Sequence, residues 1–191
     1  LAASRTADAA GNLFLETINT YDFLDVDTGT TIAQPDSLTA TVFPQLVRTD
    51  NLFYEGQAVA GKATFMTYAY DALGNVVEYF DAANLDTTAD DVTSVIGYHS
   101  DPAAYIVGKA DSVTVTGQGG NGAGGTYRTR EATFETSTGN LLSLRSVLEN
   151  GTAAVTDMTY DGFGNLIRVT GPANATGQRY ALDYTFDPDV A

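Results

Sequence analysis

The stretch YDALGNVVEY, residues 70–79, has a near copy in YDGFGNLIRV, residues 160–169. Both place Asp, two intervening residues, Gly and Asn in the same order, with an aromatic residue before them and an aliphatic residue after. Two such copies in a chain of 191 residues allow two interpretations: a site that carries chemistry, or a repeated turn that shapes the backbone.

The same motif occurs twice more in the chain. Residues 8–13 read DAAGNL, and residues 134–141 read FETSTGNL, with one residue inserted. The residues that share the motif are Asp8, Gly11 and Asn12; Tyr70, Asp71, Gly74 and Asn75; Glu135, Gly139 and Asn140; and Tyr160, Asp161, Gly164 and Asn165. Repetition at intervals of tens of residues is typical of an array of similar supersecondary units.

The residue types of this motif predict a hairpin turn. An acid at the first position accepts hydrogen bonds from backbone N–H groups two residues on, and Gly supplies the positive φ with which the second strand departs. The flanking residues are expected to pair across the hairpin, Tyr70 with Val76 and Tyr160 with Leu166. Asp, Gly and Asn are thereby accounted for without catalysis. Because isolated hairpins are marginally stable, each must lie against its neighbours in a continuous sheet.

Strand patterns fill much of the remaining chain. Apolar and polar residues alternate, threonine, valine and tyrosine are abundant, and 19 glycines break the pattern into short lengths, as expected of strands separated by turns. The segments with this pattern are 64–70, 112–116, 126–134, 141–148, 155–160 and 180–186. Loops are expected at 25–36, 81–91, 117–125, 149–153 and 171–177. No strong helix is predicted, and residues 88–96 fit a helical turn, a strand or a loop. The sequence therefore predicts an all-β fold.

Composition excludes several classes of function. The chain has 9 basic and 24 acidic residues and a net charge of −15, so it lacks the clustered Lys and Arg that contact nucleic-acid phosphates. It contains no cysteine, which excludes disulfides, thiolate zinc sites and thiol nucleophiles. No run of eighteen apolar residues and no leader of signal length is present, so no membrane insertion is expected. The acidic charge is consistent with solubility in an extracellular setting.

The motif Tyr-Asp-x-x-Gly-Asn-Leu/Val resembles the YD repeat of the Rhs family. That family includes bacterial Rhs proteins, the shell-forming B and C components of insecticidal toxin complexes, and the teneurins. YIVGK at residues 105–109, followed by SVTVT, resembles the family's entry to a repeat tract, and residues 126–171 read like two consecutive repeats. The resemblance is strongest over residues 54–186 and weaker over 1–53, which holds one copy near 8–13. We therefore predict a single YD/Rhs-repeat-like β domain over residues 1–191.

The resemblance implies antiparallel β-hairpins joined edge to edge in a curved strip, which acts as a container or scaffold. The chain departs from the family pattern in two ways. It has too few repeats to close a shell, and its last residues, DYTFDPDVA, lack the acidic autoproteolytic segment, so neither self-cleavage nor an enclosed toxin is implied. Open strand edges must be capped or paired. Two interpretations stay open: a piece of a longer Rhs-like chain, or a subunit whose copies pair end to end in a fibre.

Two acidic loops suggest a calcium site, because Ca²⁺ takes six to eight oxygen ligands from flexible loops. The acids of the two loops are Asp22, Asp25 and Asp27, and Asp81, Asp86, Asp90 and Asp91. Neither loop has the regular Asp-x-Asp-x-Asp-Gly spacing with a bidentate acid at the twelfth position. Calcium is therefore a candidate ligand without a matching motif, and no other cofactor is predicted.

The sequence also bears on functions other than a structural one. Eleven tyrosines and no tryptophan favour cross-strand packing, although rows of Tyr on a sheet also bind sugars. A glycoside hydrolase needs two facing acids, one of them desolvated, and most acids here lie in polar turns. His99, the single histidine, has no nucleophile context and is expected at a turn or on the surface. Two sequons, beginning at Asn150 and Asn174, fall in predicted loops.

The leading interpretation is a non-enzymatic structural protein, secreted or on the surface of a bacterium. Its expected partners are other copies of itself, or the rest of a longer Rhs-like chain, bound through β-strand edges. A carbohydrate- or surface-binding module is the alternative, and a hydrolase with paired carboxylates is less favoured.

Overall fold

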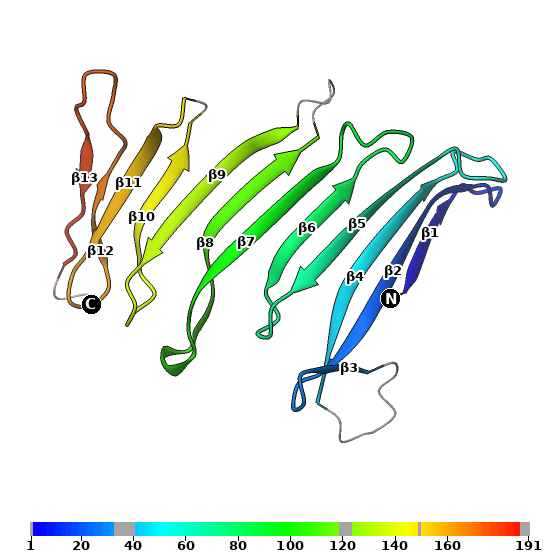
Figure 1. Cartoon of the computed structure of the whole chain (residues 1–191), viewed down its shortest axis with the longest axis horizontal. Helices are drawn as coiled ribbons and strands as arrows, with labels where there is room; N and C mark the ends of the chain where they lie inside the picture. The colour runs from blue at the N-terminus through cyan, green and yellow to red at the C-terminus, as the bar shows by residue number, and fades with distance from the viewer. Residues whose placement is uncertain (1, 33–40, 119–123, 149, 188–191) are drawn as a thin grey trace. The chain divides into compact units, whose positions relative to one another are not determined.

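The computed structural model describes residues 2–32, 41–118, 124–148 and 150–187, and within them the chain is all-β (Figure 1). Its strands are β1 (Ala3–Ala7), β2 (Leu13–Asp25), β3 (Thr30–Ile32), β4 (Val42–Phe53), β5 (Lys62–Tyr70), β6 (Val76–Ala82), β7 (Val92–Asp101), β8 (Ile106–Gly117), β9 (Gly125–Phe134), β10 (Leu141–Val147), β11 (Ala153–Tyr160), β12 (Leu166–Thr170) and β13 (Ala181–Asp183). One short 3-10 helix, η1 (Pro102–Ala104), joins β7 to β8. No helix in these ranges is long and apolar enough to cross a membrane.

The strands pair in the order of the chain. Hydrogen bonds link β1, β2, β4 and every later strand to its successor in one antiparallel sheet, and β3 pairs with β2 beside this path (Figure 1). Neighbouring strands are therefore hairpins joined edge to edge, which confirms the predicted fold class. The central strands β7, β8 and β9 each contribute residues to both of two compact units.

Unit 1 comprises residues 1–95 and 115–126, and unit 2 comprises residues 96–114 and 127–191. The single domain expected over residues 1–191 stays a prediction.

Most of the segments expected as strands are strands in the structure. The pattern at 64–70 lies within β5, and those at 112–116, 126–134, 141–148 and 155–160 correspond to β8, β9, β10 and β11. Residues 88–91 form turns, and β7 begins at Val92, so the ambiguous segment 88–96 contains no α-helix. The predicted strand 180–186 is shorter than expected, since β13 covers three residues. The expected loop at 25–36 contains β3, and its residues 33–36 lie outside the described part of the chain.

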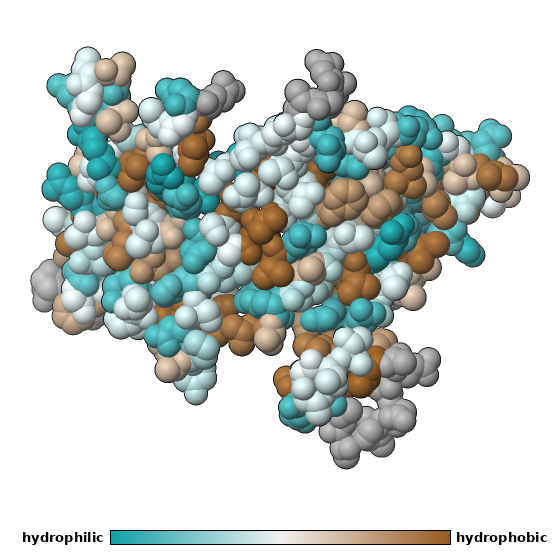
Figure 2. Space-filling model, in the orientation of Figure 1, coloured by the Kyte–Doolittle hydropathy of each residue, from teal (hydrophilic) through white to brown (hydrophobic). Residues whose placement is uncertain are grey.

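The sheet has almost no closed core. Among the residues that the structure describes, only Ala82 and Ile106 are buried hydrophobic residues, with 4% and 8% of their surfaces exposed. Figure 2 shows hydrophobic and hydrophilic residues interleaved over one face. Stability must therefore come mainly from the backbone ladder and from side-chain pairs between adjacent strands. In unit 1, for example, the Arg48 guanidinium lies 3.9 Å from the centre of the Phe65 ring and bonds Asp50.

The strand register gives unit 2 two different faces. Met158 lies opposite Val169, and Val169 lies opposite Leu182, so these three apolar side chains form a row on one face. The alternate positions carry charges, as expected of an antiparallel sheet with one apolar face. The ion pairs are Arg145–Glu131, Arg168–Asp183 and Arg179–Asp157, with N···O distances of 2.7, 3.3 and 2.7 Å.

Candidate functional site

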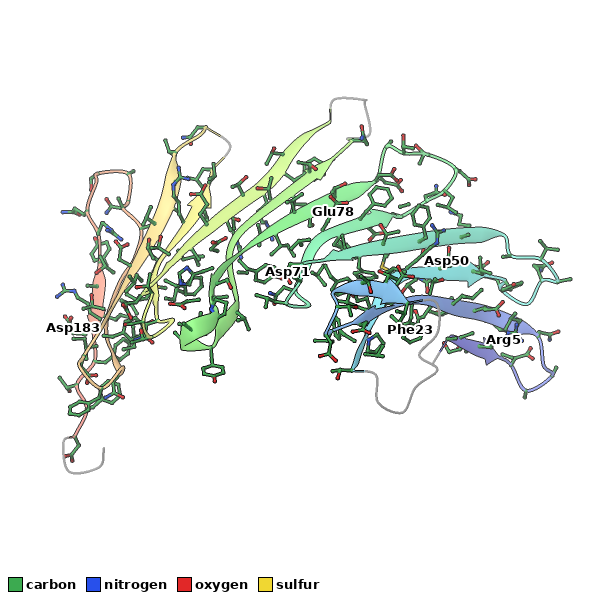
Figure 3. The ribbon with its side chains drawn as sticks, turned by 60° about the horizontal axis from the view of Figure 1, so that its bottom comes forward. Arg5, Phe23, Asp50, Asp71, Glu78 and Asp183 are labelled. Carbon is green, nitrogen blue, oxygen red and sulfur yellow. The ribbon has the colours of Figure 1, made fainter. Side chains whose placement is uncertain are left out.

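The turn between β5 and β6 is a five-residue hairpin corner, here called the Asp–Gly–Asn corner. Asp71 lies at its start (Figure 3), where Oδ1 accepts the N–H groups of Leu73 and Asn75, each at 2.9 Å. Its Oδ2 accepts the side-chain amide of Asn75, also at 2.9 Å. The Gly74 N–H donates to the Asp71 carbonyl, and Gly74 has a φ of +85°. One carboxylate thus fixes the turn, and Gly allows the backbone to leave it.

The corners at Asp161 and Asp8 have the same geometry. Asp161 accepts the N–H groups of Phe163 and Asn165 at 2.9 Å each and the Asn165 amide at 3.0 Å. The corresponding bonds to Asp8 measure 2.9, 2.8 and 2.8 Å. Gly164 and Gly11 have φ values of +85° and +86°. The three copies therefore repeat one structure at the level of single hydrogen bonds.

Each corner is followed by a β-bulge on the outgoing strand. Tyr70 lies opposite Val76 and Tyr160 opposite Leu166, as the sequence predicts. The next pair is Ala69 with Glu78, so Val77 is an extra residue. The corners at Asp8, Glu135 and Asp161 show the same register shift. A bulge after a Gly with positive φ bends and twists the strand, so each repeat imposes the same local twist.

The tyrosine of the motif attaches the corner to the preceding strand. The Tyr70 hydroxyl donates to the carbonyl of Leu46 in β4 at 2.9 Å. The Tyr160 hydroxyl donates to the carbonyl of Leu141 in β10 at 3.0 Å. The Tyr70 ring also meets Phe43 edge to face, with centroids 6.1 Å apart. Sequence reasoning assigned these rings to cross-hairpin pairing alone and missed the hydroxyl contacts.

Glu135 fills the acid position of the corner with the inserted residue. Its carboxylate accepts the Thr138 N–H at 2.7 Å, the Ser137 hydroxyl at 2.7 Å and the Ser137 N–H at 3.2 Å. Hydrogen bonds from Thr138 and Ser137 favour the charged form and lower the pKa of Glu135 to about 2. Gly139, with a φ of +70°, is buried against Ile106. The longer acid thus spans the longer turn.

The other corner acids are also held in the ionised form. The side-chain amide of Asn12 lowers the pKa of Asp8, and that of Asn165 lowers the pKa of Asp161. Burial acts to raise the pKa of Asp71, but the hydrogen bonds from Asn75 outweigh it, and the pKa is lowered. Carboxylates of this kind are poor general acids, because a general acid must hold its proton near neutral pH.

A further corner escaped the motif search. The Asn174 Oδ1 accepts the N–H groups of Thr176 and Gln178 at 3.0 and 2.9 Å. Gly177 has a φ of +82°, and its N–H donates to the Asn174 carbonyl. The backbone is that of the Asp–Gly–Asn corner, with Asn in place of Asp and Gln in place of Asn. The spacing from Asn174 to Gly177 is the signal that would have found it.

The acids suggested for calcium serve turns and strands instead. Asp25 Oδ1 accepts the N–H groups of Asp27 and Thr28, and Asp81 accepts the Tyr79 hydroxyl at 3.2 Å. Asp22 lies within β2, while Asp86, Asp90 and Asp91 lie in the connection from β6 to β7. Within the described ranges no three His, Cys, Asp or Glu residues come together as a possible metal site. The structure thus does not assemble either predicted set.

His99, expected at a turn or on the surface, lies within strand β7 and is half-buried. Its ring stacks on Phe134, with centroids 6.0 Å apart and an interplanar angle of 25°. Its Nε2 is buried and has no hydrogen-bond partner among the residues that the structure describes. The ring therefore packs as part of the sheet.

Two tyrosines form a pair of rings on unit 1. Tyr68 of β5 lies directly opposite Tyr79 of β6, and the ring centroids are 5.5 Å apart with a 49° tilt. The Tyr79 hydroxyl reaches Asp81, two residues along its own strand. Both tyrosine side chains are half-buried. Burial, together with the charge of Asp81, raises the pKa of Tyr79 to about 12.

Repeated corners, bulges and antiparallel register together define a β-sheet of repeated hairpins. No family model and no curated protein matches the chain. Solved structures do match it along nearly its whole length. A crystal structure of TcdB2-TccC3 without the hypervariable C-terminal region covers 97% of this chain at 14% identity and a TM-score of 0.35. A second TcdB2-TccC3 structure covers 96% at 13% identity and a TM-score of 0.34.

The third match is a Photorhabdus luminescens Tc holotoxin pore with a TccC3 mutation, which covers 91% of the chain at 12% identity and a TM-score of 0.27. Toxin-complex components are also among the proteins that the sequence motif resembles. The chain spans 12% of the length of the first two solved chains and 11% of the third.

Proposed function

We propose that this chain is a non-enzymatic structural module, a YD/Rhs-repeat β scaffold that forms part of an extracellular shell or assembles into a surface fibre by strand-edge pairing. The observation that carries the proposal is the repeated corner. The same carboxylate-to-backbone bonds recur at Asp8, Asp71 and Asp161. A catalytic residue usually occurs at one place in a protein, whereas these three carboxylates make the same turn-forming contacts at three places.

Burial supports the same proposal. A sheet with two buried hydrophobic residues in its described part gains little from an internal core, so contacts beyond the chain are expected to add stability. Its outermost strands expose backbone hydrogen-bonding groups that pair readily with another strand. Location outside a bacterial cell is part of the proposal, supported by the net charge of −15.

Electron microscopy of the purified 191-residue chain tests the proposal. Fibres, shell-like particles or defined oligomers support a scaffold that assembles through its edges. Particles of one chain at every concentration would contradict self-assembly. A long flanking repeat tract in the gene would then favour a segment of a larger shell.

A second candidate function is glycan binding, favoured by the Tyr68–Tyr79 ring pair. Aromatic faces stack on sugar rings, and polar groups beside them fix the orientation. Beside this pair, the Asp81 carboxylate offers such a group. The net charge makes neutral sugars better ligands than acidic ones.

A glycan array tests this candidate. Binding of neutral glycans that is lost in Tyr68→Ala and kept in Tyr105→Ala supports it, since Tyr105 is 93% exposed and lies in unit 2. If no glycan binds, or if both variants lose binding equally, the glycan-binding function is contradicted. The paired-carboxylate hydrolase gains no support from the described residues, because each acid whose pKa shifts is shifted downward.

A further inference from the structure

Strand β13 of unit 2 and the residues on either side of it carry an exposed apolar stripe. Tyr180, Leu182 and Tyr184 occupy alternate positions and therefore share one face. Their exposed fractions are 70%, 64% and 43%. Leu182 continues the row of Val169 and Met158, so the stripe is the outer margin of the apolar face. On the opposite face Asp183 (Figure 3) pairs with Arg168.

Hydrogen bonds show which backbone groups of β13 face outward. The Tyr180 carbonyl accepts the Gly171 N–H at 2.8 Å, and the Tyr184 N–H donates to the Ile167 carbonyl at 2.9 Å. The backbone N–H and carbonyl groups of residues 180, 182 and 184 therefore point toward β12. Those of Ala181 and Asp183 point away from it. In the described part of the chain, β13 pairs with β12 alone.

From this pattern we propose that β13 is the assembly edge, and that its partner is β13 of a second copy, paired antiparallel about Leu182. This inference rests on the proposed edge-pairing function and names the edge and the partner. In this register, Ala181 of each copy faces Asp183 of the other, so the outward N–H and carbonyl groups of both meet. Leu182 faces its counterpart across the two-fold axis, and Tyr180 faces Tyr184.

Side chains favour this register over its neighbour. Both registers place the apolar residues of the two copies on one face, so the charged residues decide between them. Pairing about Leu182 sets each Asp183 against an alanine. Pairing about Asp183 would place two carboxylates directly opposite, and like charges in that position destabilise a sheet.

The other outer strand is a poor partner for β13. All five residues of β1 are exposed, and alternate positions carry Ala3, Arg5 and Ala7 on one face and Ser4 and Thr6 on the other. None of these covers Tyr180, Leu182 or Tyr184. The apolar stripe of β13 therefore matches a second β13 better than it matches β1.

Proline substitutions distinguish the two edges. Ala181→Pro removes an outward N–H at the first residue of β13, where Pro is tolerated in an edge strand. Ala3→Pro is the matched control, because the Asn19 N–H donates to the Ala2 carbonyl, so the next residue, Ala3, faces outward from β1. Sedimentation velocity across a range of concentrations should show a weak dimer, as expected of a small interface. Ala181→Pro should raise its dissociation constant about tenfold or more, since two hydrogen bonds are lost per dimer. Ala3→Pro should leave it unchanged.

A cysteine crosslink tests the register directly, because the chain has no cysteine of its own. Residues in a non-hydrogen-bonded antiparallel pair lie about 4.5 Å apart at Cα, within disulfide range. Oxidised Leu182→Cys should therefore form a covalent dimer, and Tyr184→Cys should not.

The results of these experiments distinguish β13 pairing from assembly through strand edges in general. Larger assemblies weakened equally by both proline variants would overturn the β13 pairing while keeping edge assembly. A chain that stays monomeric at every concentration and forms no crosslink would contradict both the β13 pairing and self-assembly through strand edges, and would leave the segment of a larger shell as the proposed function.

Discussion

The hydroxyl of Tyr70 donates to the carbonyl of Leu46, 2.9 Å away and on the strand before its own hairpin. The equivalent bond from Tyr160 to Leu141 measures 3.0 Å. Each repeat is thus attached to its predecessor by a side chain as well as by the backbone ladder. An aromatic residue with a hydroxyl is required for this contact, which gives a physical reason for Tyr before Asp in the two most similar copies.

Removing either hydroxyl should therefore destabilise the sheet. Tyr70→Phe and Tyr160→Phe keep the ring and lose one hydrogen bond, with an expected loss of about 1 kcal/mol in the free energy of unfolding. Urea denaturation followed by circular dichroism measures the effect. Tyr105→Phe is the control, because Tyr105 is 93% exposed and should change little. Equal stability of all three variants would show that the hydroxyl contacts contribute nothing.

Replacing the corner glycines by alanine should destabilise the fold by different amounts, depending on the φ of each glycine and on the atoms near it. Gly164→Ala places a side chain at positive φ and should cost about 1–2 kcal/mol. Gly74→Ala should cost more, because a Cβ there would also lie 3.1 Å from the Phe43 ring, whereas Gly164 has no atom within 4 Å. Gly162→Ala, in the same turn as Gly164 but without positive φ or close neighbours, should be near neutral. Melting temperatures of the three variants test the ranking.

Local signals made the corners predictable from sequence. Asp71 and Gly74 act within five residues, and their types follow from turn geometry alone. The bond from Tyr70 to Leu46 joins residues 24 positions apart, so it depends on which strands become neighbours. Nothing near Tyr70 in the sequence specifies that neighbour.

Two other features of the structure, the corner at Asn174 and the helix η1, were not predicted from the sequence, and each has a physical reason. The corner at Asn174 keeps the spacing of the motif but replaces both its acid and its Asn, so a search by residue type misses it. The helix η1 is held by Asp101, whose side chain accepts the N–H groups of Ala103 and Ala104. It is too short to produce helical periodicity.

The corner at Asn174 also predicts the effect of changing Asp71. There the Asn oxygen still accepts two backbone N–H groups, while its amide lies 3.5 Å from the Gln178 oxygen. Asp71→Asn should therefore keep the two backbone bonds and lose the bond from the Asn75 amide. Asp71→Ala loses all three. We expect Asp71→Ala to be more destabilising than Asp71→Asn by about 1 kcal/mol, measured by urea denaturation. The reverse order would contradict the turn-forming role of the carboxylate.

Acid should weaken the fold through the corner at Glu135. Its pKa falls from 4.5 to about 2 on folding, so the unfolded chain binds the proton more tightly. The resulting stabilisation is present above pH 4.5 and is lost as the pH falls toward about 2. Glu135→Gln removes this titration, and the melting temperature of the variant should depend less on pH across that window than that of the wild type. Glu131→Gln is the control, since the Glu131 carboxylate is bound by Arg145 instead of a turn. Unchanged pH dependence in Glu135→Gln would show that its hydrogen bonds do not stabilise the charged carboxylate.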